Sequence, residues 1–217
     1  MKIQRESQVC RSHLLKMAML SHRAVDYSVK AYELGDLEFC GLIRSSDQEW
    51  RNLQRAIGDR GRALLAAGSS IDAHSLAARC RLRIYSALRV TYTAAAEIAH
   101  NSALIADVDP SIRTPEIQQM GRLVNGLVTL YTVALFTNQT QLVKAILRSD
   151  QDRHWFDLTL NVVRQSLSMR PSRQARSELA IVRSLGQIAE QAHEAAKAIS
   201  IWMENMRYLA VPSECAA

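Results

Sequence analysis

Apolar residues recur every three or four positions along most of the chain, which is the spacing of one face of an α-helix. The pattern is clear at Leu14, Met17, Leu20 and Ala24, and comparable stripes occur in five further stretches. No segment alternates apolar and polar residues between hairpin-type turns, so we predict no sheet. The predicted helices span about residues 8–34, 37–67, 74–106, 115–137, 141–168 and 173–209. Their short connections favour antiparallel neighbours.

Several predicted helix ends carry residues that suit a cap. Gly35 is placed to end the first helix in a left-handed conformation, and Asp36 can cap the next one. Thr114 precedes Pro115, which suits the first helical position, and Ser172 can cap the last helix. These residues set the limits of the helices independently of the apolar stripes.

One stretch of the chain occurs twice. The third predicted helix contains Ala96-Glu97-Ile98-Ala99-His100 and the sixth contains Ala189-Glu190-Gln191-Ala192-His193, 93 residues later. A second echo, Ser46-Asp47-Gln48-Glu49 and Ser149-Asp150-Gln151-Asp152, is offset by 103 residues. The difference between the offsets predicts a loop about ten residues shorter in the second half. We therefore predict one helical unit written twice.

The boundary between the two units falls in the only linker-like run of the chain. Residues 107–115 contain two prolines and three possible caps. The predicted organisation is a first three-helix unit at 1–107, a linker at 108–115 and a second three-helix unit at 116–217. The predicted fold class is all-α, a tandem repeat of two antiparallel three-helix bundles.

Composition narrows the class of protein and its surroundings. The 217 residues are 48% hydrophobic and 22% charged, with a net charge of +6, which suits an acidic partner but falls well short of a nucleic-acid-binding tail. Four cysteines without paired or metal-type spacing indicate free thiols in a reducing compartment. The first residues lack the apolar core of a signal peptide. We expect a soluble, cytoplasmic protein that does not bind nucleic acid.

The second predicted helix carries a stripe of arginines roughly 140° away from its apolar stripe. Two interpretations stay open, a solvated outer face or a basic strip that binds an acidic partner. The stripe consists of Arg44, Arg51, Arg55 and Arg62.

The repeated Glu-x-x-His pairs raise the possibility of an enzyme. Two such pairs form half of a ferritin-like di-iron site, in which every ligand projects inward. Glu97 and Glu190, however, fall at about 180° from the apolar stripes of their own helices. The sequence therefore predicts that both glutamates point away from the core. A di-iron carboxylate oxidoreductase is kept only as an alternative, and it would use these two glutamates together with His100 and His193.

An outward-facing metal site is a second possibility for these residues. Asp150, His154 and Asp157 share one face of the fifth predicted helix, and Glu190 and His193 could border it. Such a mixture of carboxylates and imidazoles suits Fe, Zn or Mn. The alternative is an ordinary polar solvent face. With no glycine-rich phosphate loop and no Gly-x-Ser-x-Gly motif, we expect no catalytic activity.

The third predicted helix, together with Asp47 opening an Asp-x-x-Trp-x-x-Leu pattern, resembles the PhoU family of cytoplasmic regulators of phosphate uptake. The matching positions are Arg83, Glu97 in place of Asp, Ala99, Asn101 and Ala103, and in the second copy Arg176, Glu190 and Ala192. The resemblance covers nearly the whole chain through loose motifs.

The resemblance implies a regulator rather than an enzyme. Such proteins couple the ATPase subunit of a phosphate ABC transporter to a sensor histidine kinase, repress the phosphate-starvation response, often form homodimers and meet the membrane only through partners. The paired acids that hold surface metal in some members are incomplete, because Thr93 and Gly186 occupy the upstream positions. A PhoU-like regulator of a different transporter is a further alternative. Candidate metal ligands are Glu97, His100, Asn101, Asp150, His154, Asp157, Glu190 and His193, and candidate partner-binding residues are Arg44, Arg51, Arg55, Arg62, Arg83 and Arg176.

Overall fold

The computed structural model describes the backbone at residues 2–67, 73–148, 150–169 and 172–210, and the side chains at 8–59, 76–148, 156–169 and 172–205. Every regular element in these ranges is helical, which confirms the predicted fold class. The elements are α1 (Lys2–Leu34), α2 (Glu38–Ala67), α3 (Ala73–Leu104), a short 3-10 helix η1 (Pro110–Ile112), α4 (Pro115–Thr137), α5 (Thr140–Arg148), α6 (Asp150–Ser168) and α7 (Arg173–Ala210).

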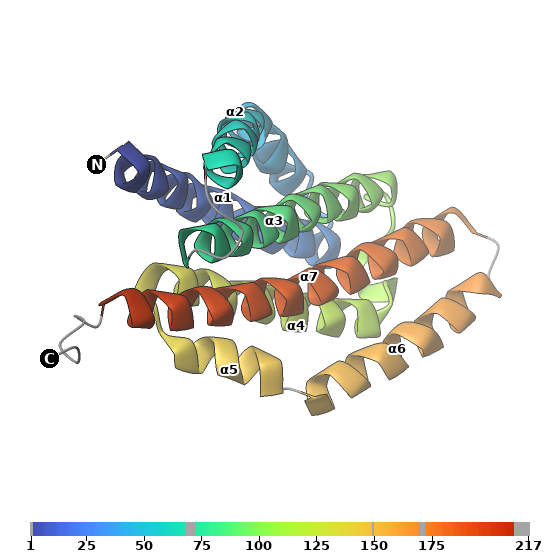
Figure 1. Ribbon diagram of the computed structural model, residues 1–217. Coiled ribbons are helices and arrows are strands. Elements are labelled where there is room, and N and C mark those ends of the chain that lie inside the picture. The colour runs from blue at the N-terminus through green and yellow to red at the C-terminus, as the bar shows by residue number, and fades with distance from the viewer. Residues whose placement is uncertain (1, 68–72, 149, 170–171, 211–217) are drawn as a thin grey trace, which may run out of the picture.

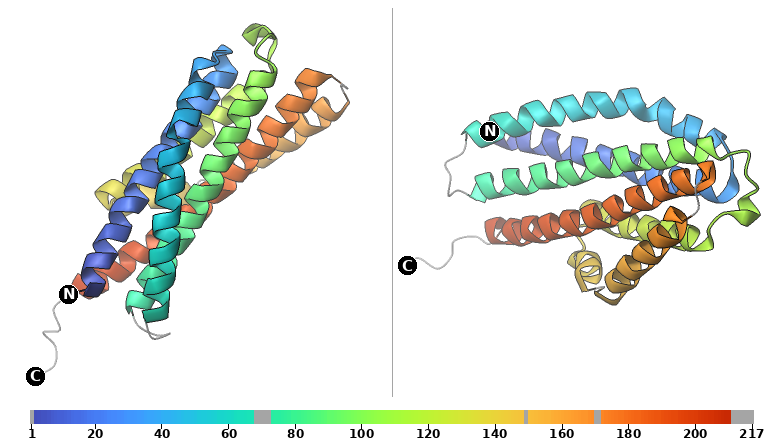
Figure 2. Two further views of the ribbon diagram at one scale, coloured as in Figure 1. Left: turned by 90° about the horizontal axis from the view of Figure 1, so that it is seen from above. Right: turned by 90° about the vertical axis from the view of Figure 1, so that its right-hand side faces the viewer.

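The helices stack in layers, with α2 on one side of the molecule and α5 and α6 on the other (Figures 1 and 2). Between them, α3 lies against α7 and α1 lies against α4, so that the two halves of the chain meet along two pairs of helices. The buried residues of both halves form one continuous cluster. The division at residues 108–115 therefore remains a prediction about the sequence, while the helices share one core.

Small residues allow the helices of the two halves to approach closely. Ala95 and Ala99 on α3 and Ala192 and Ala195 on α7 are buried, and these two long helices lie against each other. Where α1 meets α4, a side chain at Gly121 would lie 3.1 Å from the Cγ1 atom of Val29. Close backbone approach therefore places the two halves against each other.

The predicted caps are present at three helix ends. Gly35 has a φ of 72° and its N–H donates to the Ala31 carbonyl, which closes α1. Asp36 Oδ1 accepts from the Glu38 N–H, 2.8 Å away, at the start of α2. Ser172 Oγ accepts from the Ala175 N–H at 3.0 Å, at the start of α7.

The prediction of one helix at 141–168 is wrong, because the structure has two helices there, α5 and α6, whose axes diverge (Figure 1). Buried Val143 and Ile146 define the inner face of α5, and buried Phe156 and Val163 define that of α6. At 100° per residue these two faces are about 120° apart around a single continuous helix. One straight helix could not turn both faces to the core.

The linker between the halves is held by a buried arginine. Arg113 is 1% exposed, and its guanidinium donates to the Tyr32 carbonyl, to Ile105 O at 3.1 Å and to Val108 O at 3.2 Å. The Tyr32 and Ile105 carbonyls lie at the C-terminal ends of α1 and α3, where helices lack internal donors. A cation there also opposes the negative end of each helix dipole. Arg113 thus ties the linker to both helix ends.

A buried glutamate completes this junction from the opposite half. Glu178 on α7 is 2% exposed and accepts from the Tyr32 hydroxyl at 2.9 Å. It also accepts from the hydroxyl and the N–H of Thr114, the residue that precedes α4. The carboxylate therefore sits at the N-terminus of α4, where negative charge is stabilised. Burial, followed by the charge and hydrogen bond of Glu178, raises the pKa of Tyr32 well above its ordinary range.

Among the described helices, α4 alone is long and apolar enough to cross a membrane. Half of its most apolar window is buried within the bundle. This burial is typical of a core helix, which passes the same test of length and composition.

Candidate functional site

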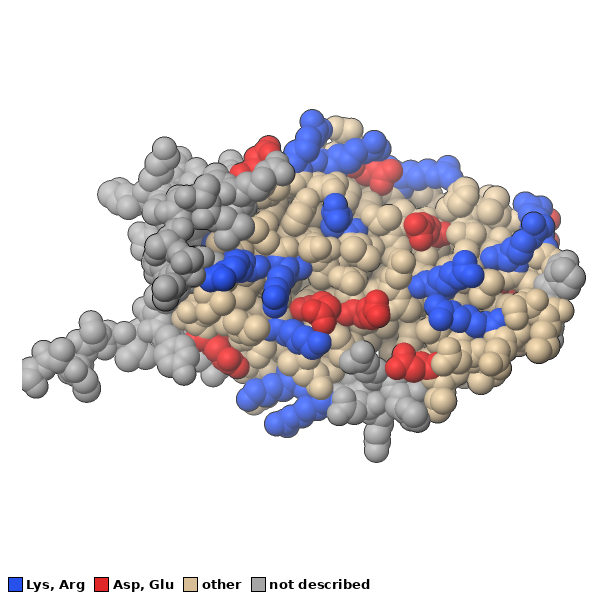
Figure 3. Space-filling view, turned by 45° about the vertical axis from the view of Figure 1, so that its right-hand side comes forward, with Lys and Arg blue, Asp and Glu red and all other residues tan. Residues whose placement is uncertain are grey.

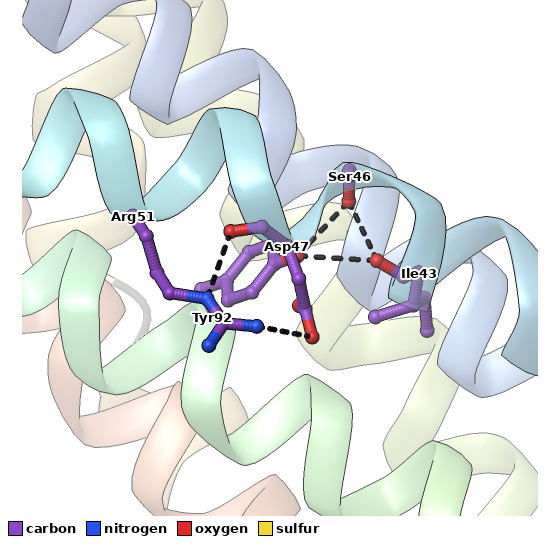
Figure 4. Close-up of polar contacts among 5 residues, drawn as sticks. All are labelled: Ile43, Ser46, Asp47, Arg51 and Tyr92. Atoms are coloured by element: carbon purple, nitrogen blue, oxygen red, sulfur yellow. Dashed lines mark hydrogen bonds and ion pairs between the residues drawn. The ribbon is translucent and has the colours of Figure 1, made fainter.

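In the first half, Ser46 and Asp47 of the Ser-Asp-Gln-Glu motif connect α2 to α3 through hydrogen bonds. The Tyr92 hydroxyl on α3 donates to Asp47 Oδ1 at 2.9 Å and lies 2.9 Å from Ser46 Oγ, which in turn donates to the Ile43 carbonyl (Figure 4). Arg51 reaches the same carboxylate with an N–O distance of 3.7 Å, in an exposed ion pair that contributes little. Asp47 therefore acts as an anchor between two helices.

Aromatic packing reinforces this contact. The Trp50 ring stacks on the Tyr92 ring with centroids 4.0 Å apart and planes 8° apart. Burial is the main cause that raises the pKa of Tyr92 to about 12, and Asp47 adds to the effect. The hydroxyl thus stays protonated and remains a donor at neutral pH.

The repeated glutamate of the first copy lies at the margin between α3 and α7. Glu97 is exposed, as the sequence predicts, and its Oε2 accepts from the Ser184 hydroxyl at 3.0 Å. His100 is exposed one turn further on, and the Asn101 amide donates to the Glu97 carbonyl rather than outward. None of these three residues lines the groove that holds Glu190 and His193.

The second Glu-x-x-His pair lies in the wall of a groove of about 440 Å³ between α6 and α7. Glu190 and His193 contribute to its α7 wall and Asp157 to its α6 wall, so part of the predicted outward-facing set does share one surface. The side chains of Asp150 and His154 lie outside the described residues. The remaining lining residues are Leu123, Leu127, Phe156, Leu160, Arg164, Arg183, Gly186, Gln187, Ala189, Gln191, Glu194 and Lys197.

The groove holds metal-ligand residue types without gathering them. His193 Nδ1 lies 3.0 Å from the Ala189 carbonyl, which can only accept, so Nδ1 is the donor in this contact. Among the side chains that the structure describes, no three of His, Cys, Asp and Glu lie close enough to hold one metal ion. Binding of Fe, Zn or Mn stays a prediction.

The groove carries charges of both signs. Arg164 and Arg183 lie at the end where α6 approaches the start of α7, and Glu190 and Glu194 lie further along α7. Glu194 accepts from Lys197 at 2.8 Å, and this contact is the main cause that lowers the pKa of its carboxyl. Sequence reasoning missed both arginines, since a single charged residue on an amphipathic helix gives no sign of what it faces.

The arginine stripe on α2 is exposed where its side chains are described. Arg55 donates to the Asn52 side chain at 2.9 Å, Arg51 meets Asp47, and Arg44 is exposed. The Arg62 side chain lies outside the described residues. Both interpretations of the stripe, a solvated face and a partner surface, therefore stay open.

Charges of both signs cover the face that α3 and α7 share (Figure 3). Arg83 on α3 and Arg176 on α7 are both exposed. Arg83 lies near enough to Glu194 to help lower the pKa of that carboxyl. Mixed charge of this kind suits a protein partner better than a polyanion.

Comparisons with known proteins place the fold. No protein-family model matches the chain, and no curated protein sequence matches it. PhoU from Pseudomonas aeruginosa matches in structure with a TM-score of 0.78 and 18% identity, over 94% of this chain and 99% of that one. The phosphate transport system regulatory protein PhoU from Streptococcus pneumoniae matches with a TM-score of 0.71 and 17% identity, over 93% and 96% of the two chains. The resemblance seen in the sequence is confirmed for the fold: over nearly its full length, this chain has the fold of PhoU proteins.

Proposed function

We propose that this protein is a cytoplasmic negative regulator of phosphate uptake and of phosphate-starvation signalling. It acts as a helical adaptor between the ATPase subunit of a phosphate ABC transporter and a sensor histidine kinase. The observation that carries the proposal is the match of both halves, over nearly their full length, to PhoU structures, one of which is described as a phosphate transport system regulatory protein. Fold alone does not fix function, so the surface must also suit the role.

The exposed surface supports an adaptor. Long helices present mixed charge on the α3 and α7 face and arginines on α2, and both kinds of surface suit protein partners. The helices share one core, which gives such a surface a fixed shape. We propose Arg44, Arg51 and Arg55, with Arg62, Arg83 and Arg176, as the partner-binding residues.

The rival di-iron oxidoreductase is less well supported. It needs Glu97, His100, Glu190 and His193 to converge inside the bundle. Glu97 instead meets Ser184, while Glu190 and His193 line the groove beside α6. We therefore propose a non-enzymatic protein.

Affinity purification of the tagged chain from its host, grown with plentiful phosphate, tests the proposal. The transporter ATPase and the kinase should be recovered with the parent chain. Recovery should fall by at least tenfold for the triple variant Arg44→Glu, Arg51→Glu and Arg55→Glu. A control with equal charge change, Lys16→Glu, Arg23→Glu and Lys144→Glu, alters exposed residues on α1 and α5 and should leave recovery unchanged.

The same experiment separates the alternatives. Recovery of an ATPase that belongs to a transporter of another solute would favour a PhoU-like regulator of that transporter. Loss of recovery in both variants would assign the effect to net charge and remove the α2 stripe from the proposal. Recovery of neither partner with the parent chain would contradict the adaptor role.

A further inference from the structure

Two buried arginines differ in how their charge is compensated. Arg113 is 1% exposed, and its guanidinium donates to several backbone carbonyls. Arg81 on α3 is 8% exposed, yet within the described part of the chain its guanidinium has no hydrogen bond and no ion pair, and its Nε atom is buried without an acceptor. Arginine stays protonated in proteins, and a buried charge is normally paired. Arg81 is therefore a buried cation to which the described residues offer no counter-charge.

A second donor without an acceptor lies in the same contact. The Arg81 guanidinium lies over the ring of Trp202 on α7, with its central carbon 5.6 Å from the ring centroid. Trp202 is 3% exposed, and its Nε1 atom, which can only donate, has no hydrogen-bond partner among the described residues. Contact with the indole offsets part of the cost of burying the cation. It supplies no acceptor, so a group that accepts hydrogen bonds would suit both side chains.

Another cation shares the Trp202 ring. The guanidinium carbon of Arg11 on α1 lies 5.7 Å from the same centroid, and the side chain donates to the neutral side chain of Asn138 at 3.2 Å. Burial is the main cause that lowers the pKa of Arg81, and the charge of Arg11 also lowers it. Two positive charges at one ring repel each other, and an anion beside them would relieve that repulsion.

The helix segments that carry these arginines contain no acidic residue. Residues 8–25 of α1 include Arg11, Lys16 and Arg23 and no Asp or Glu. Residues 73–96 of α3 include four arginines and again no Asp or Glu. These two helices pack together, and their first turns lie at the same end of the bundle as the last turns of α7 (Figures 1 and 2). Positive charge at this end is therefore written into two helices.

Two acids of α7 toward this end have other partners. Glu194 accepts from Lys197 at 2.8 Å, and Glu204 accepts from the Ser200 hydroxyl at 3.3 Å. Neither is among the groups that shift the pKa of Arg81. The α7 helix thus does not supply the counter-charge that α1 and α3 lack.

We propose that Arg81 and Arg11 bind an oxyanion at this end of the molecule, beside the Trp202 ring. We call this place the Arg11–Arg81 site. A guanidinium fits the oxygens of a phosphate, sulfate or carboxylate group. Because Arg81 is almost fully buried, the group that reaches it is small. Because two cations share the ligand, a divalent oxyanion binds more tightly than a monovalent one.

The Arg11–Arg81 site does not depend on the proposed phosphate function and would stand if that function were wrong. It follows from uncompensated charge and unpaired donors, which attract sulfate as well as phosphate. The oxyanion is either a free ion or a phosphate group on a larger molecule, since both present the same oxygens. We expect a dissociation constant of about 0.1–10 mM for a small ion held by a few contacts.

Isothermal titration calorimetry of the full chain, in chloride buffer at constant ionic strength, tests the proposal. Sulfate and phosphate should bind the parent chain, and acetate should bind about tenfold more weakly. Arg81→Met should weaken sulfate binding about tenfold or more, and Arg11→Met about threefold to tenfold. The matched control is Arg89→Met, which removes one charge from an exposed residue of the same helix and should bind like the parent.

Thermal unfolding separates anion binding from a purely structural role of Arg81. In chloride alone, Arg81→Met should unfold at the same temperature as the parent or above it, because the substitution removes an unpaired buried charge. Sulfate stabilises folded proteins in general, so the comparison between variants carries the result. Added sulfate should raise the Tm of the parent and of Arg89→Met by more than that of Arg81→Met.

Glycerol 3-phosphate distinguishes the two sources of the oxyanion. An affinity within about threefold of that for inorganic phosphate would support a site for a phosphate group on a larger molecule. An affinity about tenfold weaker or less would support a site for free ions.

Three results would overturn the proposal. A parent chain that binds neither sulfate nor phosphate up to about 50 mM has no such site. A folded Arg81→Met variant that binds both ions as tightly as the parent would place the binding elsewhere. Equal stabilisation of the parent, Arg81→Met and Arg89→Met by sulfate would reduce the effect to the general action of the salt.

Discussion

The middle segments of the two halves differ in structure although both contain a Ser-Asp-Gln motif followed by an acidic residue. In the first half, α2 is one helix, and Asp47 and Trp50 bind Tyr92 of the following long helix. In the second half, the residue that corresponds to Tyr92 by the shift of 93 is Leu185, which has no hydroxyl to donate. The next residue, Gly186, adds no side chain and lies against Leu160 of α6.

The comparison teaches that two stretches with the same sequence motif are held in different ways. The first half closes its middle helix on the bundle by stacking and hydrogen bonds. In the second half, two helices, α5 and α6, take the place of one middle helix. A groove lies between α6 and α7, and the apolar side chains of Leu158 and Val162 on α6 are exposed. We call the first half closed and the second half open, and we expect the closed half to be the more stable of the two.

The largest expected loss of stability follows from a substitution in the closed half. Trp50→Ala should lower the free energy of unfolding by about 3–5 kcal/mol, because it removes a buried ring and its stacking on Tyr92. Phe156→Ala, on the open half, should cost about half as much, since α6 can shift to fill the space. Urea denaturation of both variants measures the difference. Equal losses would mean that α6 is held as firmly as α2.

The junction should come next, because it joins the two halves. Glu178→Ala should cost about 3 kcal/mol, as it leaves the Tyr32 hydroxyl and the Thr114 N–H without their partner. Arg122→Ala, which removes an exposed contact with Glu33, serves as the control and should cost less than about 1 kcal/mol. Calorimetry should show one transition at a lower temperature. Two separate transitions would mean that the halves fold independently.

Hydrogen exchange compares the halves without mutation. Amides of α6 should exchange about tenfold to a hundredfold faster than those in the buried middle of α2, since α2 packs along both α1 and α3, whereas α6 packs along α7 and only briefly against α4. Slower exchange in α6 than in α2 would reverse the assignment of the open and closed halves.

A smaller loss of stability is expected when the Tyr92 hydroxyl is removed, the group that Leu185 lacks in the second half. Tyr92→Phe should cost about 1 kcal/mol, as it removes the bond to Asp47 while keeping the ring stack. The folded-state pKa of Tyr92, about 12, lies above the unfolded value of about 10. Its contribution is therefore complete below pH 10 and lost as the pH rises toward 12. The variant should lose less stability than the parent across that interval, and identical alkaline profiles would refute the role of the hydroxyl.

The smallest effect concerns a contact between the halves. His22 on α1 lies 2.9 Å from Thr129 Oγ1 on α4, and burial is the main cause that lowers its pKa. The folded-state pKa is below the unfolded value of about 6.5, so this contribution is present above pH 6.5 and lost as the pH falls through the lowered pKa. His22→Gln should flatten the loss of stability between pH 7 and 5. A profile unchanged by the substitution would show that other groups cause the acid response.

Much of the fold could be predicted because local rules decide it. The apolar stripes gave the helices, and Gly35, Asp36 and Ser172 marked ends that the structure confirms. The outward direction of Glu97 and Glu190 followed from their angles to those stripes. Each of these features depends on residues within one helix or at its end.

Features that depend on two distant segments could not be predicted. Nothing near Arg113 indicates that it reaches the ends of α1 and α3, and nothing near Glu178 points to Thr114. The break before α6 did have a signal, the rotation of the apolar stripe between Ile146 and Phe156, but the continuous helical spacing concealed it. The groove then followed from the break.

The rate of phosphate uptake in the host tests the regulatory role most directly. Cells that lack the gene, grown with plentiful phosphate, should take up radiolabelled phosphate several-fold faster than the parent strain. The parent chain supplied in trans should restore the low rate, and the variant with Arg44, Arg51 and Arg55 changed to Glu should not. Uptake that is unchanged by the deletion would contradict the proposed function.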